Sequence, residues 1–253
     1  MGVASKVMAR IPVRLLVPAV AWQYRLNEPE LARFKCFVPK DRGAVDVGVW
    51  WGPWTWWLAH RVPHVDSFEA NLEIVNRLSG AMPSNVRLHP VALSDRSGEA
   101  TLWVPAGGMG TEGRATLEEG NLSNAAWQEK AITTKRLDDF ALGNIGFVKI
   151  DVEGHELAVL KGARQLLIEQ RPNLLVEIEE HSDRKGELDA IIEFLRELSY
   201  QGTYWQARQW HPIEELDRDH VRQMADRVAR YGYAANLVLH SHRYVHNFLF
   251  RPS

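Results

Sequence analysis

Carboxylates stand at regular places along this 253-residue chain, in or directly after stretches that read as buried strands. They are Asp46, Glu69 and Asp151. Gly48 and Gly52, four positions apart, follow the first of these carboxylates and mark a turn from strand to helix. The carboxyl ends of parallel strands meet at one edge of a sheet, where nucleotide-like cofactors dock. The pattern therefore predicts a cofactor site at this edge.

The first turn favours a cofactor without phosphates. The dinucleotide fingerprint needs three glycines for close approach of a pyrophosphate, and Trp50 occupies the place of the middle one. No lysine follows Gly52, so a Walker sequence is excluded. S-adenosylmethionine fits, with its methionyl end on the turn backbone and its ribose hydroxyls on Glu69, which has about the expected offset. The alternative is that Asp46 and Glu69 only cap the following helices.

Strand-like and helix-like segments alternate, which predicts βαβ units and a mostly parallel sheet. The expected strands are 44–48, 65–69, 86–93, 99–104, 132–138, 146–151, 174–179, 200–206 and 244–250. The expected helices are a short pattern at 29–37, then 55–61, one ending at 78, 156–170, 188–198 and 213–231. We expect a helical N-terminal extension over residues 1–43 and one domain over residues 44–253.

The composition limits which classes of partner the protein is expected to bind. A net charge of -2 gives no electrostatic reason to expect nucleic acid. Cys36 is the single cysteine, which excludes an internal disulfide, fits a reducing cytoplasm and predicts a buried thiol. No segment has the roughly 20 apolar residues of a membrane span. Pro18 interrupts the apolar run 15–22, which disfavours a signal peptide. We expect an amphipathic helix on the domain; a homodimer contact and peripheral membrane contact are the alternatives.

A series of motifs recurs in a fixed order. They read Val45-Asp46-Val47-Gly48, Phe68-Glu69-Ala70-Asn71, Val91-Ala92-Leu93-Ser94-Asp95, Leu137-Asp138-Asp139-Phe140, Val148-Lys149-Ile150-Asp151-Val152-Glu153-Gly154, Leu175-Val176-Glu177-Ile178 and Tyr244-Val245-His246-Asn247-Phe248-Leu249-Phe250. Over about residues 44–251 this series resembles the FkbM-family methyltransferases. The departure is the aromatic run after Gly48, where the family commonly has small residues. The resemblance implies an α/β, Rossmann-like class I methyltransferase fold, with a mostly parallel twisted sheet, flanking helices and an antiparallel last strand.

The resemblance also implies S-adenosylmethionine-dependent O-methylation of hydroxyls on sugars, glycolipids, polyketides and related natural products. By position, the glycine turn would border the methionyl end, Glu69 the ribose, Leu93 to Asp95 the adenine, and Asp151 the transfer centre. The residues expected to bind the cofactor are Asp46, Gly48, Trp50, Gly52, Glu69, Ala70, Leu93, Ser94, Asp95 and Asp151.

Methyl transfer to an alcohol needs alignment with the sulfonium and a base for the hydroxyl proton. His155, four residues after Asp151, is the first candidate base, and Glu153 competes with it. A surface histidine at a helix start is the alternative. With Asp151 beside the reacting centre, these three residues form the expected catalytic group.

A magnesium ion is a second mechanism to consider. Asp151 and Glu177 end expected core strands, and Glu179 follows at the same edge. Hard oxygen ligands of this kind suit Mg²⁺, which would also lower the pKa of an acceptor hydroxyl. The alternative is that these carboxylates bind water or pair with arginines.

Five of the ten tryptophans fall between residues 50 and 57. Trp56 and Trp57 lie within the expected helix and are most simply explained by core or interface packing. Trp50, Trp51 and Trp54 lie at the cofactor edge, where their faces would stack on sugar rings or form a dimer contact.

The leading function is O-methylation of a sugar, oligosaccharide or glycolipid in polysaccharide biosynthesis. The alternatives are methylation of a polyketide or other small natural product, amino-sugar hydroxyls included, and a non-catalytic binding protein on the same fold. We expect the glycine-rich loop 106–124 and the N-terminal helix to shape the acceptor site.

Overall fold

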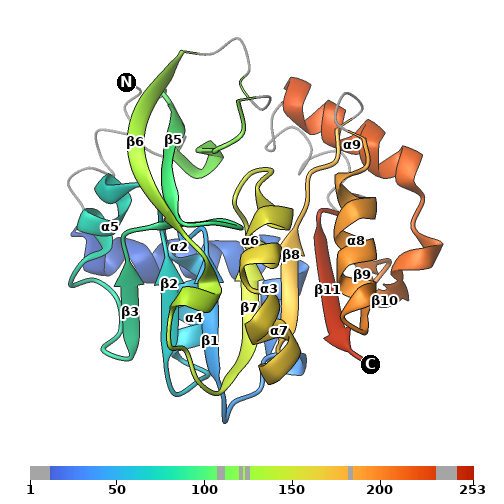
Figure 1. Ribbon diagram of the computed structural model, residues 1–253, viewed down its shortest axis with the longest axis horizontal. Coiled ribbons are helices and arrows are strands. Elements are labelled where there is room, and N and C mark those ends of the chain that lie inside the picture. The colour runs from blue at the N-terminus through green and yellow to red at the C-terminus, as the bar shows by residue number, and fades with distance from the viewer. Residues whose placement is uncertain (1–11, 107–111, 120–121, 123–125, 182–184, 232–243) are drawn as a thin grey trace.

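The computed structural model describes residues 12–106, 112–119, 122, 126–181, 185–231 and 244–253. Its centre is a sheet in the order β10-β9-β11-β8-β7-β1-β2-β3 (Figure 1). The strands are β1 (Gly43–Val47), β2 (Val65–Phe68), β3 (Val86–His89), β7 (Ile145–Ile150), β8 (Asn173–Glu177), β9 (Tyr200–Gln206), β10 (Gln209–Pro212) and β11 (Asn247–Pro252). Strands β3, β2, β1, β7 and β8 are parallel, whereas β11 runs antiparallel to β8. The parallel centre and antiparallel last strand are as the sequence predicted.

Helices cover both faces of this sheet, and Figure 1 shows α6 and α7 in front of it and α2 behind. The helices are α2 (Val13–Asn27), α3 (Pro29–Arg33), α4 (Pro53–Ala59), α5 (Leu72–Leu78), α6 (Glu156–Gly162), α7 (Arg164–Gln170), α8 (Glu187–Glu197) and α9 (Arg218–Tyr231). The main core lies between α6, α7 and α8 and one face of the sheet. A second core joins α3 and α4 to the other face.

Successive side chains of a strand point to opposite faces of the sheet, so the position of a residue along a central strand decides which face its side chain lies on. Val148 and Ile150 enter the main core, whereas Phe147 enters the second core. Lys149 therefore points to the second face. The same period places three further polar side chains on that face: Asp46, Glu177 and Asn247. The register pairs Asp46 with Lys149 and Glu177 with Asn247.

The stretch 86–93 is not one strand, as the sequence predicted, but two strands in different sheets. Strand β3 ends at His89, and β4 (Ala92–Leu93) joins a small sheet with β6 (Trp127–Lys135) and β5 (Gly98–Pro105). Pro90 lies between the two strands and has no backbone N–H to donate, so the ladder stops there.

The expected helix 156–170 is likewise two helices, α6 and α7, separated at Ala163. The carboxylate of Asp138 accepts the backbone N–H groups of Gln165 and Leu166, at 3.0 Å each. These donors would otherwise be unsatisfied at a new helix start, so a side chain distant in sequence stabilises the break. Strand β10, which the sequence did not predict, extends the sheet through a hairpin with β9.

The N-terminal segment packs on the turn after β1. Leu16 and Val20 of α2 are buried against Trp51. Cys36 is exposed, and its prediction as a buried thiol was wrong. It lies in the short 3₁₀ turn Phe34–Cys36, whose buried side chain is Phe34. None of the described helices is long and apolar enough to cross a membrane. The domain division at residue 43 stays a prediction.

Gly162 provides a test of the α6 packing. A Cβ at this position would overlap the carbonyl oxygen of Ser94, a backbone atom that cannot rotate away. We expect Gly162→Ala to lower the free energy of unfolding by about 1–3 kcal/mol in urea titrations, as overpacking does. Gly143→Ala is the matched control, because nothing lies within 4 Å of its added Cβ. Equal stability of the two variants would contradict the close approach of α6 to Ser94.

Candidate active site

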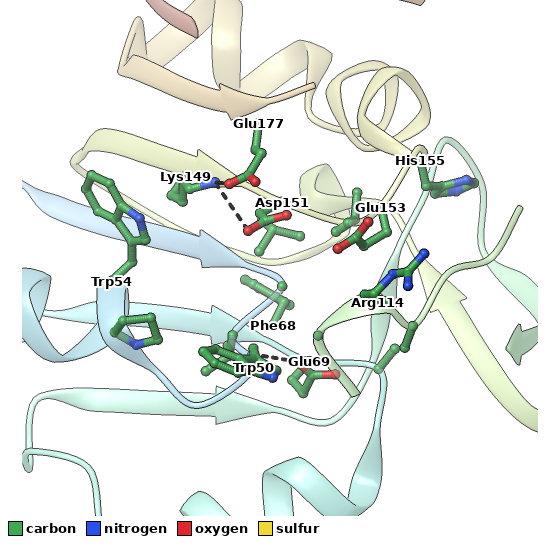
Figure 2. A pocket seen from close by; sticks show the side chains of 18 of the residues that line it. Trp50, Trp54, Phe68, Glu69, Arg114, Lys149, Asp151, Glu153, His155 and Glu177 are labelled. Atoms are coloured by element: carbon green, nitrogen blue, oxygen red, sulfur yellow. Dashed lines mark hydrogen bonds and ion pairs between the residues drawn. The ribbon is translucent and has the colours of Figure 1, made fainter. Parts of the chain in front are cut away.

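A cavity of about 550 Å³ opens at the carboxyl ends of β1, β2, β7 and β8 (Figure 2). Ten of the residues expected at the site line it: Gly48, Trp50, Glu69, Ala70, Leu93, Asp151, Glu153, His155, Glu177 and Glu179. Four expected cofactor residues are not among its lining residues: Asp46, Gly52, Ser94 and Asp95. The strand ends thus bring together most, but not all, of the expected side chains.

Glu69 holds the backbone of the first turn. Its Oε2 accepts the N–H of Trp50 at 3.1 Å, and its Oε1 accepts the N–H of Asn71 at 2.8 Å. Burial raises the pKa of Glu69, and these backbone donors oppose the rise. Because each carboxylate oxygen accepts more than one hydrogen bond, Glu69 keeps acceptor capacity toward the cavity.

Gly48 lets the ends of β1 and β7 approach closely. Its φ is +85°, and an added Cβ would overlap the carbonyl oxygen of Asp151. Any larger residue would push the turn and Asp151 apart. Gly48 therefore fixes the distance between the turn and the carboxylate at the centre of the cavity.

Asp46 lies behind the cavity wall. Its Oδ2 accepts the hydroxyl of Thr55 on α4, and Thr55 Oγ1 is 3.2 Å from Ser67 Oγ on β2. Burial raises the pKa of Asp46 to about 7. Asp46 thus ties α4 to the two strands, and in this position it supports the turn from below. Gly52, also outside the cavity, is the N-cap of α4 with a φ of +76°.

Lys149 is the buried cation of the site, and the sequence analysis did not assign it a role. Its side chain is 1% exposed, and its Nζ lies 3.6 Å from Asp151 Oδ2 and 3.4 Å from Glu177 Oε2 (Figure 2). Burial would lower the pKa of Lys149, but Asp151 and Glu177 outweigh it and the pKa is raised. A lysine inside the apolar run 147–150 was the available clue, because a buried charge requires partners.

Asp151 occupies the centre of the cavity. Burial and the neighbouring charge of Glu177 raise its pKa to about 7, while Lys149 opposes the rise. Its side chain is 36% exposed, which leaves it accessible to a ligand. A carboxyl that changes ionisation near neutral pH is suited to accepting a proton.

The structure gives the expected magnesium site no support. Within the described residues, no group of three or more His, Cys, Asp or Glu side chains is arranged to hold a metal ion. Asp151 and Glu177 instead share the ammonium of Lys149. Glu179 accepts the hydroxyl of Tyr244 at 3.0 Å and lies 3.6 Å from His181. The protein thus supplies its own counter-charge at this edge.

Both ring nitrogens of His155 are engaged. Nδ1 is 2.6 Å from Glu118 Oε1, and Nε2 is 2.9 Å from Ser94 Oγ. This is how Ser94, an expected cofactor residue, acts on the site: it contacts a residue of the cavity wall. His155 therefore links the α6 start to the loop before β6 and to β4. Its two contacts do not leave a ring nitrogen clear for an acceptor hydroxyl.

The first residue of α6, Glu156, holds the loop between β7 and α6 in place. Glu156 Oε1 accepts the N–H groups of Val152 and Gly154, at 3.1 Å each. Glu153 between them has a φ of 56°, a left-handed conformation that turns its side chain to the cavity wall. Burial and the charge of Asp151 raise the pKa of Glu153 well above its usual value.

The sequence and the fold of this chain are similar to those of known proteins. The profile of the methyltransferase FkbM domain matches residues 44–201. The chain belongs to the FkbM methyltransferase family. Its sheet order and last antiparallel strand are those of the class I S-adenosylmethionine-dependent methyltransferase fold, as the sequence predicted.

Among solved structures, the chain is similar to a methyltransferase FkbM from Methylobacillus flagellatus, with 14% identity and a TM-score of 0.50. The match covers 95% of this chain and 55% of that one, so the chain spans about half the length of that relative. A SAM-dependent methyltransferase from Aquifex aeolicus is 13% identical, with a TM-score of 0.41 and 78% and 94% of the two chains covered. No curated protein matches.

The five tryptophans between residues 50 and 57 divide into two groups. Trp50 and Trp54 line the cavity. Trp51 does not: it is 4% exposed and packs under α2, so its expected place at the cofactor edge was wrong. Trp57 donates from Nε1 to the carbonyl of Ala21 at 2.9 Å, and Trp56 packs near α5. Three of the five rings are therefore structural.

The cavity is also lined from α2 and the position after it, by Gln23, Tyr24, Asn27 and Glu28. From the loop 106–124, the lining includes Gly113 and Arg114; Gly107, Gly108, Gly110 and Gly120 lie outside the described residues. Both segments were expected from the sequence to shape the acceptor site, whereas no sequence pattern pointed to Glu28 or Arg114. Neither residue belongs to a recognisable motif.

Removing the ammonium of Lys149 tests the charge balance. We expect Lys149→Met to lower the free energy of unfolding by about 3–5 kcal/mol, because Asp151 and Glu177 lose their buried partner. Without Lys149 the pKa values of Asp151 and Glu177 rise further, because the ammonium no longer opposes the rise. At about pH 6 these carboxyls then bind protons and lose their charge, so the loss of stability will be smaller there than at about pH 8. Urea titrations at both pH values measure this.

Lys130→Met is the matched control, because Lys130 pairs with the exposed Glu73 at 2.6 Å. Its loss will stay below about 1 kcal/mol. A loss for Lys149→Met no larger than the control, or one independent of pH, would contradict the paired-ammonium account.

Proposed function

We propose that this protein is an S-adenosylmethionine-dependent O-methyltransferase that acts on a hydroxyl of a sugar, oligosaccharide or glycolipid. The observation that carries the proposal is the placing of Asp151. In Figure 2 it lies between the Trp50 and Glu69 side of the cavity and the Lys149 and Glu177 side. We call the Trp50 and Glu69 side the cofactor half and the Lys149 and Glu177 side the acceptor half. Asp151, a carboxyl with a pKa of about 7, lies between them.

The cofactor half fits S-adenosylmethionine through its backbone and its charge. The turn 48–50 presents main chain, Glu69 offers carboxylate oxygens for ribose hydroxyls, and apolar side chains flank a flat ring. Those apolar residues are Phe68, Val91, Leu93 and Leu102. When bound, the cofactor supplies a methyl group already activated by its sulfonium.

In the acceptor half, Asp151 takes the proton of the attacking hydroxyl. It is the best placed of the expected catalytic residues, because it occupies the centre of the cavity, whereas His155 is engaged at both ring nitrogens. Lys149 holds Asp151 in place at 3.6 Å. His155 and Glu153 then position the loop rather than accept the proton.

The acceptor half has the lining that sugars need. Tyr24 lines the cavity with an aromatic ring, and Gln23 and Asn27 offer amides that both donate and accept hydrogen bonds. Screening a panel of glycans with a labelled methyl donor tests the function, and NMR locates the new methyl group. A polyketide acceptor and a non-catalytic binding role are the alternatives, and labelling of polyketides alone would favour the former.

Glu69→Gln tests the cofactor half. We expect the affinity for S-adenosylhomocysteine, measured by calorimetry, to fall about tenfold or more, because charge-assisted hydrogen bonds to the ribose become neutral ones. Glu73→Gln, an exposed acid at the start of α5, is the control and will bind normally. Unchanged binding by Glu69→Gln would remove Glu69 from the cofactor site. No binding by the unaltered protein would overturn the proposed function.

Asp151→Asn tests the base. With an acceptor from the glycan screen, kcat/KM of the unaltered protein will rise with pH through about 7, since Asp151 must be ionised to accept a proton. Asp151→Asn will lose about 10²–10⁴-fold and the rise with it. His155→Gln will keep the rise. Loss of the rise in His155→Gln but not in Asp151→Asn would reverse the two roles.

A further inference from the structure

Glu28 carries a carboxylate oxygen for which the fold provides no partner. The residue is 8% exposed, lines the cavity and follows the last turn of α2. Its Oε1 accepts from Trp54 Nε1 at 3.2 Å and from Asn247 Nδ2 at 3.1 Å. Its Oε2 is buried and has no hydrogen-bond partner among the described residues. Unsatisfied buried acceptors are rare and costly in folded proteins, so this one points to a ligand.

The charge around Glu28 is unbalanced toward acid. The described lining of the cavity holds six carboxyl groups against two permanent cations, Lys149 and Arg114. Lys149 is already shared by Asp151 and Glu177. Figure 2 places Arg114 near Glu153 and His155, across the cavity from Glu177. Lys149 therefore acts on Glu28 through its charge alone, and no permanent cation of the described lining is a hydrogen-bond partner of Glu28.

Glu28 belongs to the acceptor half of the cavity. Its two hydrogen-bond donors come from α4 and from the start of β11, the strand next to β8. The expected cofactor contacts lie at the ends of β1 and β2, on the other side of Asp151. A cofactor held by these contacts would have its ammonium and sulfonium at the turn and Asp151, which would leave Glu28 available to a second molecule.

We propose that the acceptor carries a protonated amine, as an amino sugar does, and that Glu28 binds this ammonium while Asp151 takes the proton of a neighbouring hydroxyl. This inference rests on the proposed function and narrows its substrate class. The methyl group still goes to oxygen, so the amine is a recognition group and not the nucleophile.

An ammonium fits this place better than a further hydroxyl. Glu28 Oε2 and the buried Oδ1 of Asn247, both without a partner among the described residues, are acceptors. An ammonium has three donors and no acceptor, and it offsets the acid excess that a neutral hydroxyl would leave. Trp54 lines the same wall and donates from Nε1 to Glu28 Oε1, which leaves Oε2 for the ammonium. Burial and Glu177 raise the pKa of Glu28, and a bound cation opposes that rise.

The test compares sugars that carry a protonated amine with their uncharged N-acetyl forms. The protein is first saturated with S-adenosylhomocysteine, and that binding is measured by calorimetry. Glucosamine, galactosamine and mannosamine are then titrated against their N-acetyl counterparts. We expect at least one amine to bind about tenfold or more tighter than its N-acetyl form. Glu28→Gln, which keeps a carbonyl acceptor for Trp54 and Asn247, will lose that preference and keep its affinity for S-adenosylhomocysteine.

Glu193→Gln on the exposed side of α8 is the matched control and will keep the preference. Failure to bind S-adenosylhomocysteine would overturn the proposed function and this inference with it. Normal cofactor binding without preference for any amine would overturn this inference alone. A preference that survives in Glu28→Gln would overturn the role of Glu28. Should Glu28→Gln fail to fold, the comparison of amines with N-acetyl sugars on the unaltered protein decides.

Discussion

The ammonium of Lys149 is the charge on which the site depends. It is buried on the second face of the sheet, between carboxylates at the ends of its own strand and of β8. Such a charge is stable only where partners surround it, and the carboxylates are equally costly without it. The mutual requirement holds Asp151 at the centre of the cavity. It also keeps the pKa of Asp151 from rising above about 7, close to the value that a base needs.

Several carboxylates here accept hydrogen bonds from the backbone or from neighbouring elements. Glu69 accepts N–H groups of the first turn, and Glu156 those of the loop after β7. Asp46 binds Thr55 beneath the turn. The turn and loop that form the cavity wall are thereby fixed before any ligand binds, which is what alignment of a methyl donor and an acceptor requires.

The aromatic residues that distinguish this chain from its family are explained by the N-terminal helix. Trp51 and Trp57 pack α2 onto the turn after β1 and onto α4. That packing places Tyr24 and Glu28 at the cavity. Small residues after Gly48 would leave α2 without this contact surface. The tryptophan run thus serves the acceptor side mainly by holding the helix that lines it, and only Trp50 and Trp54 line the cavity themselves.

The sequence alone determined the alternation of strands and helices, the edge at which the acids gather and the family, because period and motif are local properties. It also predicted Glu69 and Asp151 at the cavity. Only the tertiary structure decided that Ala92–Leu93 pairs with β6 in a second sheet and that α7 starts where Asp138 accepts its backbone N–H groups, because both depend on partners distant in sequence. The roles of Lys149 and Glu28 also could not be predicted from the sequence. Their roles come from burial and from the charges that the fold places around them, and neither is a property of neighbouring residues in the chain.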